Sequence, residues 1–362
     1  MPSSGILLEV QKRPQSSILR QKEAQVQMLP PLVSSLYSTK YASFDQASLK
    51  RECEKIFEQE VIPVKESEIR YLEEQTRLQS QSLLWFKHRV GRITASNFGD
   101  VGRARKVDPS CSLAKAIMQE RHFDSSNVPS LNWGITNESV AREAYLTTES
   151  SKHTSLEYRA SGLHIHKEYS YLAASPDGIV SCNCCGEGLI EIKCPYKFRD
   201  SHPKEVSDRS FYLQEDYDGE LRLSHDHTYY AQIQGQLEVC DKHFCDFVCW
   251  TTKGIHVERI IRDPSFFEKL KPSLDHFFKE AVLPRILCGS DLDADSNKEN
   301  MDVVDEQTEP LYCWCQEPEF GRMVGCDNEF CEYQWFHYSC VGITRKPRGK
   351  WYCSEACKSA SN

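Results

Sequence analysis

The chain has 362 residues, enough for one large domain with its own core and one small satellite domain. It contains no run of about 20 apolar residues that could span a membrane, and its first residues lack the apolar stretch of a secretory signal, so we expect a soluble, intracellular protein. Residues 46–288 hold 32 Lys and Arg against 36 Asp and Glu, which argues against a passive scaffold that coats nucleic acid.

The expected elements follow in chain order. Residues 1–45 are rich in Ser, Gln and Pro, and we expect a disordered or loosely attached arm. Strong helix formers predict a helix over 67–89, and helical patterns recur at about 112–123 and 134–149. The remaining expected elements are sheet segments at 162–180 and 188–194, a helix at 229–240, a strand pair at 245–252 and 255–262, and a closing helix at 264–288. This order predicts an α/β domain over 46–288, with helices on both sides of a small sheet.

The C-terminal part begins with an acidic stretch and ends with a metal-ligand pattern. Residues 289–310 hold eight acids against Lys298, which predicts an acidic flexible linker. Segment 311–358 then carries four cysteines, one histidine and three cysteines, in the order Cys313, Cys315, Cys326, Cys331, His337, Cys340, Cys353 and Cys357. Eight such ligands suffice for two closed tetrahedral zinc sites, and a segment this poor in apolar residues needs such sites to fold. We therefore predict two zinc ions here.

This segment resembles the PHD fingers of the inhibitor-of-growth family. The resemblance implies interleaved ligands, with one zinc on Cys313, Cys315, His337 and Cys340 and the other on Cys326, Cys331, Cys353 and Cys357. Three residues separate the last two cysteines where the family has two, so the last knuckle is expected to be looser.

The same resemblance implies a binding site for a methylated tail of histone H3. Its methyl-lysine cage falls on Tyr312, Gly321, Met323 and Trp335, and Asp327 matches an acid that pairs with a histone arginine. Aromatic faces and a thioether suit a trimethylammonium group, which keeps its charge but cannot donate hydrogen bonds. Two alternatives stay open: the aromatic residues only pack the finger's core, or the basic run 345–350 binds phosphoinositides.

In the large domain, two short motifs together suggest a catalytic site. Asp177 lies in a Ser-Pro-Asp-Gly turn, and fourteen residues later Glu191 precedes Lys193 by two positions. The period of a strand places Glu191 and Lys193 on one face and Ile190 and Ile192 on the opposite, buried face. The two acids could then hold Mg²⁺ or Mn²⁺, and the lysine could orient or deprotonate a water molecule. The alternatives are an ordinary turn and a structural Glu–Lys salt bridge.

Further motifs follow in a fixed order. They are Trp85 and 89–96 (RVGRITAS), then Trp133-Gly134, Glu138, Ala141-Arg142 and Tyr145, then the two motifs above, then Tyr229 and 232–234 (QIQ). Over roughly 75–265 this set resembles the phage lambda exonuclease family, also called YqaJ-type viral recombinases.

This second resemblance implies a fold, a catalytic core and a phosphate site. The fold is a restriction-endonuclease-like PD-(D/E)xK core, with a small mixed sheet flanked by helices. The implied catalytic residues are Asp177, Glu191 and Lys193, with Glu138 and Gln232 lining the site. Arg89 and Ser96 match positions that hold a 5′-phosphate, a task suited to a forked guanidinium.

A group of cysteines near the catalytic strand allows two interpretations. Cys182, Cys184 and Cys185 lie just before this strand, and Cys194 follows Lys193. They could bind a metal or an iron–sulfur cluster, but adjacent cysteines make awkward joint ligands. Free thiols are therefore the preferred interpretation.

Together these patterns predict a Mg²⁺- or Mn²⁺-dependent, exonuclease-like deoxyribonuclease in the nucleus. Its finger is expected to bring it to chromatin, which would suit a recombination or mobile-element function. DNA and the methylated tail of histone H3 are the expected partners. The alternative is a chromatin-binding adaptor whose nuclease fold is inactive, although the intact set of Asp177, Glu191 and Lys193 argues against it.

Overall fold

The structure is a computed structural model. It describes residues 28–59, 61–104, 111–119 and 128–289 and, in the finger, 313, 322–328, 331, 333–338, 340–343, 345, 347, 349–354, 357 and 358. The chain divides into two compact units, Met1–His122 with Glu138–Leu292, and Phe123–Asn137 with Asp293–Asn362. The acidic linker predicted at 289–310 lies, apart from residue 289, outside the described residues. Among the helices described, none combines the length and apolarity needed to cross a bilayer.

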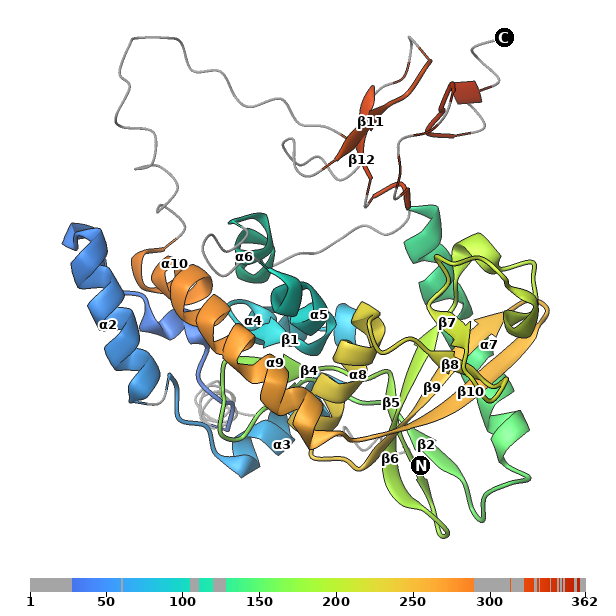
Figure 1. Ribbon diagram of the computed structural model, residues 1–362. Helices are drawn as coiled ribbons and strands as arrows, with labels where there is room; N and C mark the ends of the chain where they lie inside the picture. The colour runs from blue at the N-terminus through green and yellow to red at the C-terminus, as the bar shows by residue number, and fades with distance from the viewer. Residues whose placement is uncertain are drawn as a thin grey trace, which may run out of the picture. The chain divides into compact units, whose positions relative to one another are not determined.

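The largest sheet of the described residues is a five-stranded mixed sheet, seen toward the right of the large unit in Figure 1. Its strands are, in spatial order, β10 (Gly254–Ile261), β9 (Phe244–Thr251), β6 (Gly186–Lys193), β5 (Gly178–Cys182) and β2 (Glu157–Arg159). β5 and β6 form an antiparallel hairpin, whereas β6 and β9 run parallel. Because parallel neighbours need a crossover, α8 (Thr228–Val239) lies between them in the chain. The predicted small mixed sheet flanked by helices is confirmed.

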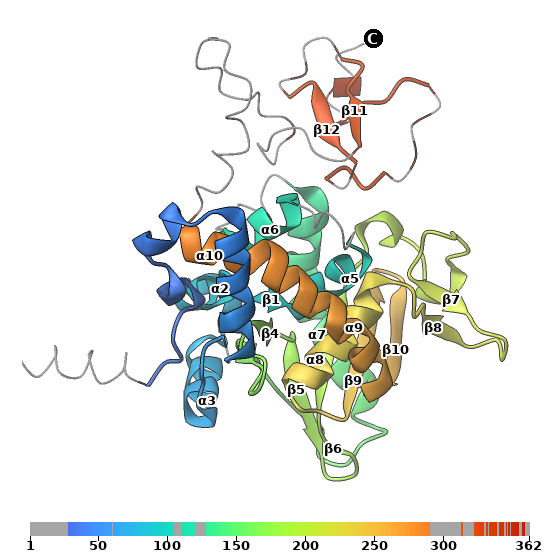
Figure 2. The ribbon, with the colours of Figure 1, turned by 60° about the vertical axis from the view of Figure 1, so that its left-hand side comes forward.

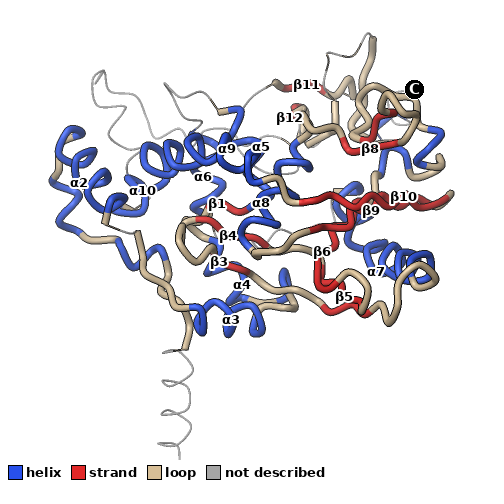
Figure 3. The backbone as a smooth tube through the Cα atoms, turned by 60° about the horizontal axis from the view of Figure 1, so that its bottom comes forward, coloured by secondary structure: helices blue, strands red, loops and turns tan. Residues whose placement is uncertain are grey.

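Opposite faces of β6 contact different helices (Figure 3). Ile190 and Ile192 pack with Ala141 and Tyr145 of α7 (Pro129–Glu149). Glu191, which lies between these two isoleucines, instead reaches α8. The alternation predicted for this strand is therefore confirmed.

Short strands and further helices complete this unit. A three-stranded sheet contains β1 (Ile93–Thr94), β4 (Leu172–Ala174) and β3 (His164–Ile165), and a hairpin joins β7 (Leu213–Glu215) to β8 (Leu221–Leu223). Within the described residues, the other helices of at least six residues are α2 (Gln46–Glu58), α3 (Glu66–Gln75), α4 (Leu83–Arg89), α5 (Ala95–Arg103), α6 (Cys111–Met118), α9 (Pro264–Phe277) and α10 (Leu283–Cys288). A π-helical turn, η7 (Phe278–Val282), joins α9 to α10, and α2 packs against both the turn and α10 (Figure 2).

The helix predicted over 67–89 is divided in the structure. α3 ends at Gln75, where the hydroxyl of Thr76 donates a 2.6 Å hydrogen bond to the carbonyl of Leu72. Gln79 then adopts a left-handed backbone conformation (φ 44°), and its amide donates to the carbonyls of Ser161 and Pro176. Tertiary hydrogen bonds thus override the local helix propensity, and Gln79 anchors the backbone just before Asp177.

Residues 28–45 also differ from the prediction of a loosely attached arm. They form the 3₁₀ turns η1 (Val33–Leu36) and η2 (Thr39–Ser43), in which Val33 and Tyr41 are buried in the main core. The guanidinium of Arg92, itself fully buried, donates to the carbonyl of Pro31 at 2.9 Å. The ordered domain therefore includes residues from 28 onward, because this segment satisfies buried groups of the core.

Close packing of α5 against α8 predicts a measurable stability effect. A Cβ at Gly235 would lie 2.4 Å from the Phe98 ring, so Gly235→Ala should lower the free energy of unfolding by about 1–3 kcal/mol, as overpacking does. Gly134→Ala is the matched control, since a Cβ there meets nothing within 4 Å and should stabilise its helix. Urea unfolding of both variants checks this prediction. Equal stabilities would show that α5 and α8 do not approach this closely.

Candidate functional site

The β5–β6 hairpin places Asp177 beside the strand that carries Glu191 and Lys193. Gly178 pairs with Ile190, and the Asp177 carboxylate Oδ2 accepts a 2.7 Å hydrogen bond from the backbone N–H of Ile192. The Tyr158 hydroxyl donates to the Asp177 carbonyl at 3.0 Å. A Cβ at Gly178 would lie 2.1 Å from the Tyr158 ring, so this close approach requires glycine. The Asp177 carboxylate is thus held against β6 at Ile192, the residue between Glu191 and Lys193.

Glu191 is the centre of a buried polar network. The residue is 2% exposed, and its Oε1 accepts hydrogen bonds of 2.6 Å from both Lys193 Nζ and Gln232 Nε2. Its Oε2 accepts a 2.8 Å hydrogen bond from Gln236 Nε2. Sequence reasoning identified Gln232 but missed Gln236, although a spacing of four residues places both on one helix face. α8 therefore supplies two donors that fix the orientation of this carboxylate.

Electrostatic interactions connect the predicted site residues. Burial, followed by repulsion from Glu191, raises the pKa of Asp177 well above its usual range. Burial is also the largest cause that raises the pKa of Glu138, and Glu191 adds to it. Burial alone would lower the pKa of Lys193, but the interactions with Glu191, Tyr229 and Asp177 outweigh it and raise that pKa. The site therefore holds crowded acids beside a lysine that remains cationic.

These residues suit a hard divalent cation. Carboxylate oxygens are the preferred ligands of Mg²⁺ and Mn²⁺, and a cation would offset the repulsion that raises the pKa of Asp177. Within the part of the chain that the structure describes, Asp177 Oδ1 accepts no hydrogen bond. The carboxylate oxygens of Glu138, Asp177 and Glu191 do not all lie within 4.8 Å of one another. The proposed cation ligands are therefore Asp177 and Glu191. The alternative Glu191–Lys193 salt bridge is present, as one part of this larger network.

Arg89 and Ser96, the predicted phosphate ligands, both contact Thr94. Arg89 Nη2 lies 3.5 Å from Thr94 Oγ1, and the Ser96 hydroxyl lies 3.0 Å from the same atom. Arg89 stacks over Trp85 at 4.0 Å and lines a cavity of about 180 Å³. Burial lowers the pKa of Arg89 to about 10, and no carboxylate of the described residues offsets this effect. A half-buried guanidinium without an acidic partner suits an anionic ligand.

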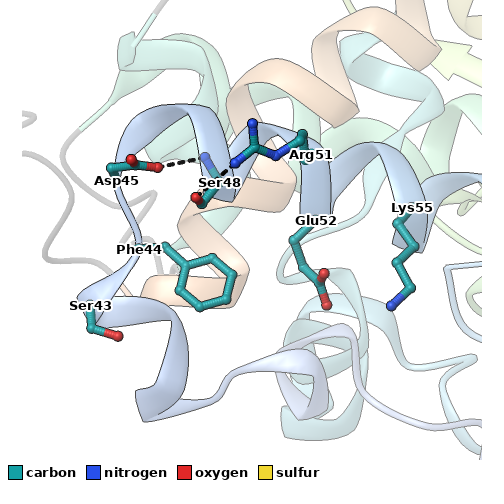
Figure 4. A pocket seen from close by; sticks show the side chains of 7 residues that line it. All are labelled: Ser43, Phe44, Asp45, Ser48, Arg51, Glu52 and Lys55. Carbon is teal, nitrogen blue, oxygen red and sulfur yellow. Dashed lines mark hydrogen bonds between the residues drawn. The ribbon is translucent and has the colours of Figure 1, made fainter.

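A larger pocket lies elsewhere, at the start of α2 (Figure 4). It measures about 610 Å³ and is lined by Ser43, Phe44, Asp45, Ser48, Arg51, Glu52 and Lys55. The Asp45 carboxylate caps α2 by accepting a 2.7 Å hydrogen bond from the Ser48 N–H, and Arg51 donates to the Ser48 hydroxyl. None of the predicted site residues lines this pocket.

In the finger, the described ligands form two clusters that match the implied interleaving. One contains Cys326, Cys331, Cys353 and Cys357, and the other contains Cys313, His337 and Cys340. Within each cluster the ligand atoms lie within 4.8 Å of one another. The extra residue before Cys357 does not displace it, because its Sγ is 3.4 Å from that of Cys353. Cys315, the remaining predicted ligand, lies outside the described residues.

The predicted cage is described only in part, because Tyr312 and Gly321 lie outside the described residues. Met323 and Trp335 belong to the paired strands β11 (Met323–Gly325) and β12 (Trp335–His337), where Met323 pairs with His337 and Gly325 with Trp335. This register places the Met323 and Trp335 side chains on one sheet face. Trp335 is 49% exposed, whereas Phe336 is fully buried, so Phe336 rather than Trp335 fills the core. The Asp327 carboxylate accepts a 2.6 Å hydrogen bond from the Trp351 N–H.

Comparisons with known proteins agree with both resemblances. Residues 84–243 match the family model of the YqaJ-like viral recombinase domain. An alkaline exonuclease of Laribacter hongkongensis is 23% identical in sequence, with a TM-score of 0.39 over 55% of this chain and 92% of that chain. The Shutoff and Exonuclease Protein of Kaposi's sarcoma-associated herpesvirus is 11% identical in sequence. Its TM-score is 0.42, over 61% of this chain and 74% of that chain.

The second resemblance has curated relatives. The inhibitor of growth protein 1 homolog of Dictyostelium discoideum is 43% identical over 74 residues, which are 19% of this chain and 23% of the relative. Human inhibitor of growth protein 3 is 49% identical over 63 residues, which are 17% of this chain and 15% of the relative. The chain thus spans a quarter or less of the length of these relatives. The chain accordingly combines a YqaJ-like domain with a finger similar to those of inhibitor-of-growth proteins.

Proposed function

We propose that this protein is a Mg²⁺- or Mn²⁺-dependent deoxyribonuclease that its finger brings to chromatin in the nucleus. The observation that carries the proposal is that Lys193 contacts the buried carboxylate of Glu191, while the Asp177 carboxylate accepts a hydrogen bond from the N–H of Ile192, the residue between them. Two acids and an ammonium in one site, within a YqaJ-like domain, suit phosphodiester hydrolysis better than a structural role.

Each side chain has a distinct part in the proposed mechanism. Asp177 and Glu191 would hold the divalent ion, which supplies an acidified water and a counter-charge for the phosphate. Gln232 and Gln236 hold the Glu191 carboxylate in place, and Glu138 adds negative charge that favours cation binding. Neighbouring groups, Glu191 foremost, raise the pKa of Lys193, and its proposed part is to orient the nucleophile and balance phosphate charge.

The proposed substrate is duplex DNA with a 5′-phosphate at its end. Arg89 and Ser96 lie on α4 and α5, and their common contact with Thr94 brings a guanidinium and a hydroxyl together. Such a pair would bind the terminal phosphate and make cleavage dependent on an end. Covalently closed circles should then be spared.

The proposed ligand of the finger is the methylated N-terminal tail of histone H3. The exposed Trp335 face and the thioether of Met323 suit a methylated ammonium, and Asp327 is an exposed acid that could pair with an arginine. Attachment to marked chromatin would raise the local concentration of the nuclease at its substrate, which would suit a recombination or mobile-element function.

Cleavage of three DNA substrates in the presence and absence of divalent ions tests the proposal. With Mg²⁺ or Mn²⁺, we expect degradation of linear 5′-phosphorylated duplex, slower degradation of the 5′-hydroxyl form, and no cleavage of closed circles. Dialysis against metal-free buffer should abolish the activity, and adding Mg²⁺ should restore it. Dialysis is preferred to a strong chelator because a chelator would also remove structural zinc. Absence of cleavage by folded protein with either ion would favour the inactive-adaptor alternative.

A further inference from the structure

A third cluster of metal-ligand side chains lies outside both sites described above. It contains His153, Cys182, Cys184 and Cys185, whose ligand atoms all lie within 4.8 Å of one another. His153 follows α7, Cys182 ends β5, and the other two cysteines form the turn to β6. Cys194, considered with these cysteines from the sequence, does not belong to the cluster. Sequence reasoning missed His153 because 28 residues separate it from Cys182.

Most distances within this cluster agree with a tetrahedral zinc site, and the separation of the Cys182 and Cys184 sulfurs is shorter. Zn–S bonds of about 2.3 Å and Zn–N bonds of about 2.0 Å require S···S separations of roughly 3.8 Å and S···N separations of roughly 3.5 Å. His153 Nδ1 lies 3.6, 3.3 and 3.5 Å from the sulfurs of Cys182, Cys184 and Cys185. Cys184 Sγ lies 3.3 Å from Cys182 Sγ and 3.7 Å from Cys185 Sγ. The turn therefore allows the adjacent cysteines to converge on one point.

Polar contacts around the cluster resemble those that support metal ligands. The backbone N–H of Cys185 donates to Cys182 Sγ at 3.3 Å, an arrangement that stabilises a thiolate. The ring Nε2 of His153, which faces away from the sulfurs, lies 3.8 Å from the buried carboxylate of Glu149. A carboxylate on the far side of a histidine orients the ring and raises its basicity as a ligand. The Asn183 N–H also donates to the Thr154 carbonyl at 2.9 Å, which joins the two loops.

We propose that His153, Cys182, Cys184 and Cys185 bind a structural zinc ion. Three thiolates and one imidazole complete the closed tetrahedral shell typical of structural zinc. A disulfide requires a sulfur separation of about 2.05 Å, well below the values found here. The site is also distinct from the proposed nuclease site, because five residues of β5 place Cys182 roughly 16 Å from Asp177 along the strand.

The zinc ion fastens the hairpin that carries the proposed nuclease acids to the end of α7. Asp177 immediately precedes β5, and Glu191 lies on β6, while Glu138 lies on α7. A metal that holds the opposite end of the hairpin against the loop after α7 limits movement of these elements relative to each other. This role belongs to the hairpin itself and does not depend on which reaction the domain performs.

Metal analysis of the full-length protein tests this site. Elemental analysis of purified wild type should give one zinc more per chain than the finger's two. The double variant Cys184→Ser, Cys185→Ser should lose that one zinc, and it should fold because both side chains are exposed. Cys288→Ser, which removes a cysteine outside all three clusters, should keep the full zinc content. After cobalt exchange, the double variant should lose part of the absorption typical of tetrahedral cobalt thiolates.

Two results of the metal analysis would overturn the inference: a wild type that contains only the finger's zinc, and a double variant whose zinc content is unchanged. Thiol labelling of wild type covers the case in which the double variant does not fold. Cys184 and Cys185 are exposed, so metal-free thiols would react at once with a small alkylating reagent. Zinc should protect them until a chelator is added. Immediate alkylation of both residues in the native protein would contradict the site, whatever the outcome of the nuclease assays.

Discussion

Lys193→Met should lower the rate of DNA cleavage by about 100- to 1000-fold, the usual cost of removing one charged or hydrogen-bonding group from a reacting centre. Its ammonium lies 2.6 Å from Glu191, and neighbouring negative groups raise its pKa, so the wild type carries a positive charge here at neutral pH. Methionine keeps most of the volume but removes that charge. The measurement is a single-turnover rate on linear 5′-phosphorylated duplex with saturating Mg²⁺.

Protein stability separates a catalytic from a structural role for this lysine. Glu191 keeps the amide donors of Gln232 and Gln236 in the variant, so thermal unfolding should remain cooperative. Lys242→Met provides the matched control, because Lys242 forms an ion pair with Glu187 of β6, the strand that carries Lys193. We expect this control to cleave at the wild-type rate. Wild-type activity in Lys193→Met would remove the lysine from the mechanism, and equal losses in both variants would indicate a general effect of lost β6 ion pairs.

The parts of the fold and site that could be predicted depend on short-range patterns. The two-residue period of β6 was enough to separate Ile190 and Ile192 from Glu191, and the structure confirms that separation. The turn at Asp177 lies fourteen residues before Glu191, a distance that an antiparallel hairpin closes. In the finger, the described cysteines group as the family pattern implies. Each of these features is encoded within a few tens of residues.

The features that were missed depend on contacts between distant segments. Gln79 bonds to the carbonyl of Pro176, which lies 97 residues away, and this contact interrupts a segment with high helix propensity. His153 joins Cys182 only because α7 ends beside the β5–β6 turn. The segment that includes Val33 looked like an arm because its few apolar residues show no period, yet they fill gaps in the core. Local composition does not encode such partners.

Gln236 is a different case, because the sequence did contain a signal for it. Gln232 and Gln236 are four residues apart on α8, and both donate to Glu191. The helix itself was predicted from Tyr229 to Cys240 and is observed as Thr228–Val239. Combining this helix with the position of Gln232 would have identified Gln236. The family pattern drew attention to one glutamine, whereas the helical period identifies a pair.

Trp335→Ala in the full-length protein should weaken binding of a trimethyl-lysine histone H3 peptide by about 30-fold or more, equivalent to about 2 kcal/mol for a desolvated cation–π contact. The finger should stay folded, because Phe336 and Trp351 form its aromatic core while Trp335 is 49% exposed. Isothermal titration measures the affinity, and an unchanged zinc content shows that the finger is intact. Lys350→Ala is the control that also addresses phosphoinositide binding, since Lys350 is an exposed member of the basic run. Unchanged peptide affinity in Trp335→Ala would reject the cage, and loss of peptide binding in Lys350→Ala alone would assign recognition to the basic run instead.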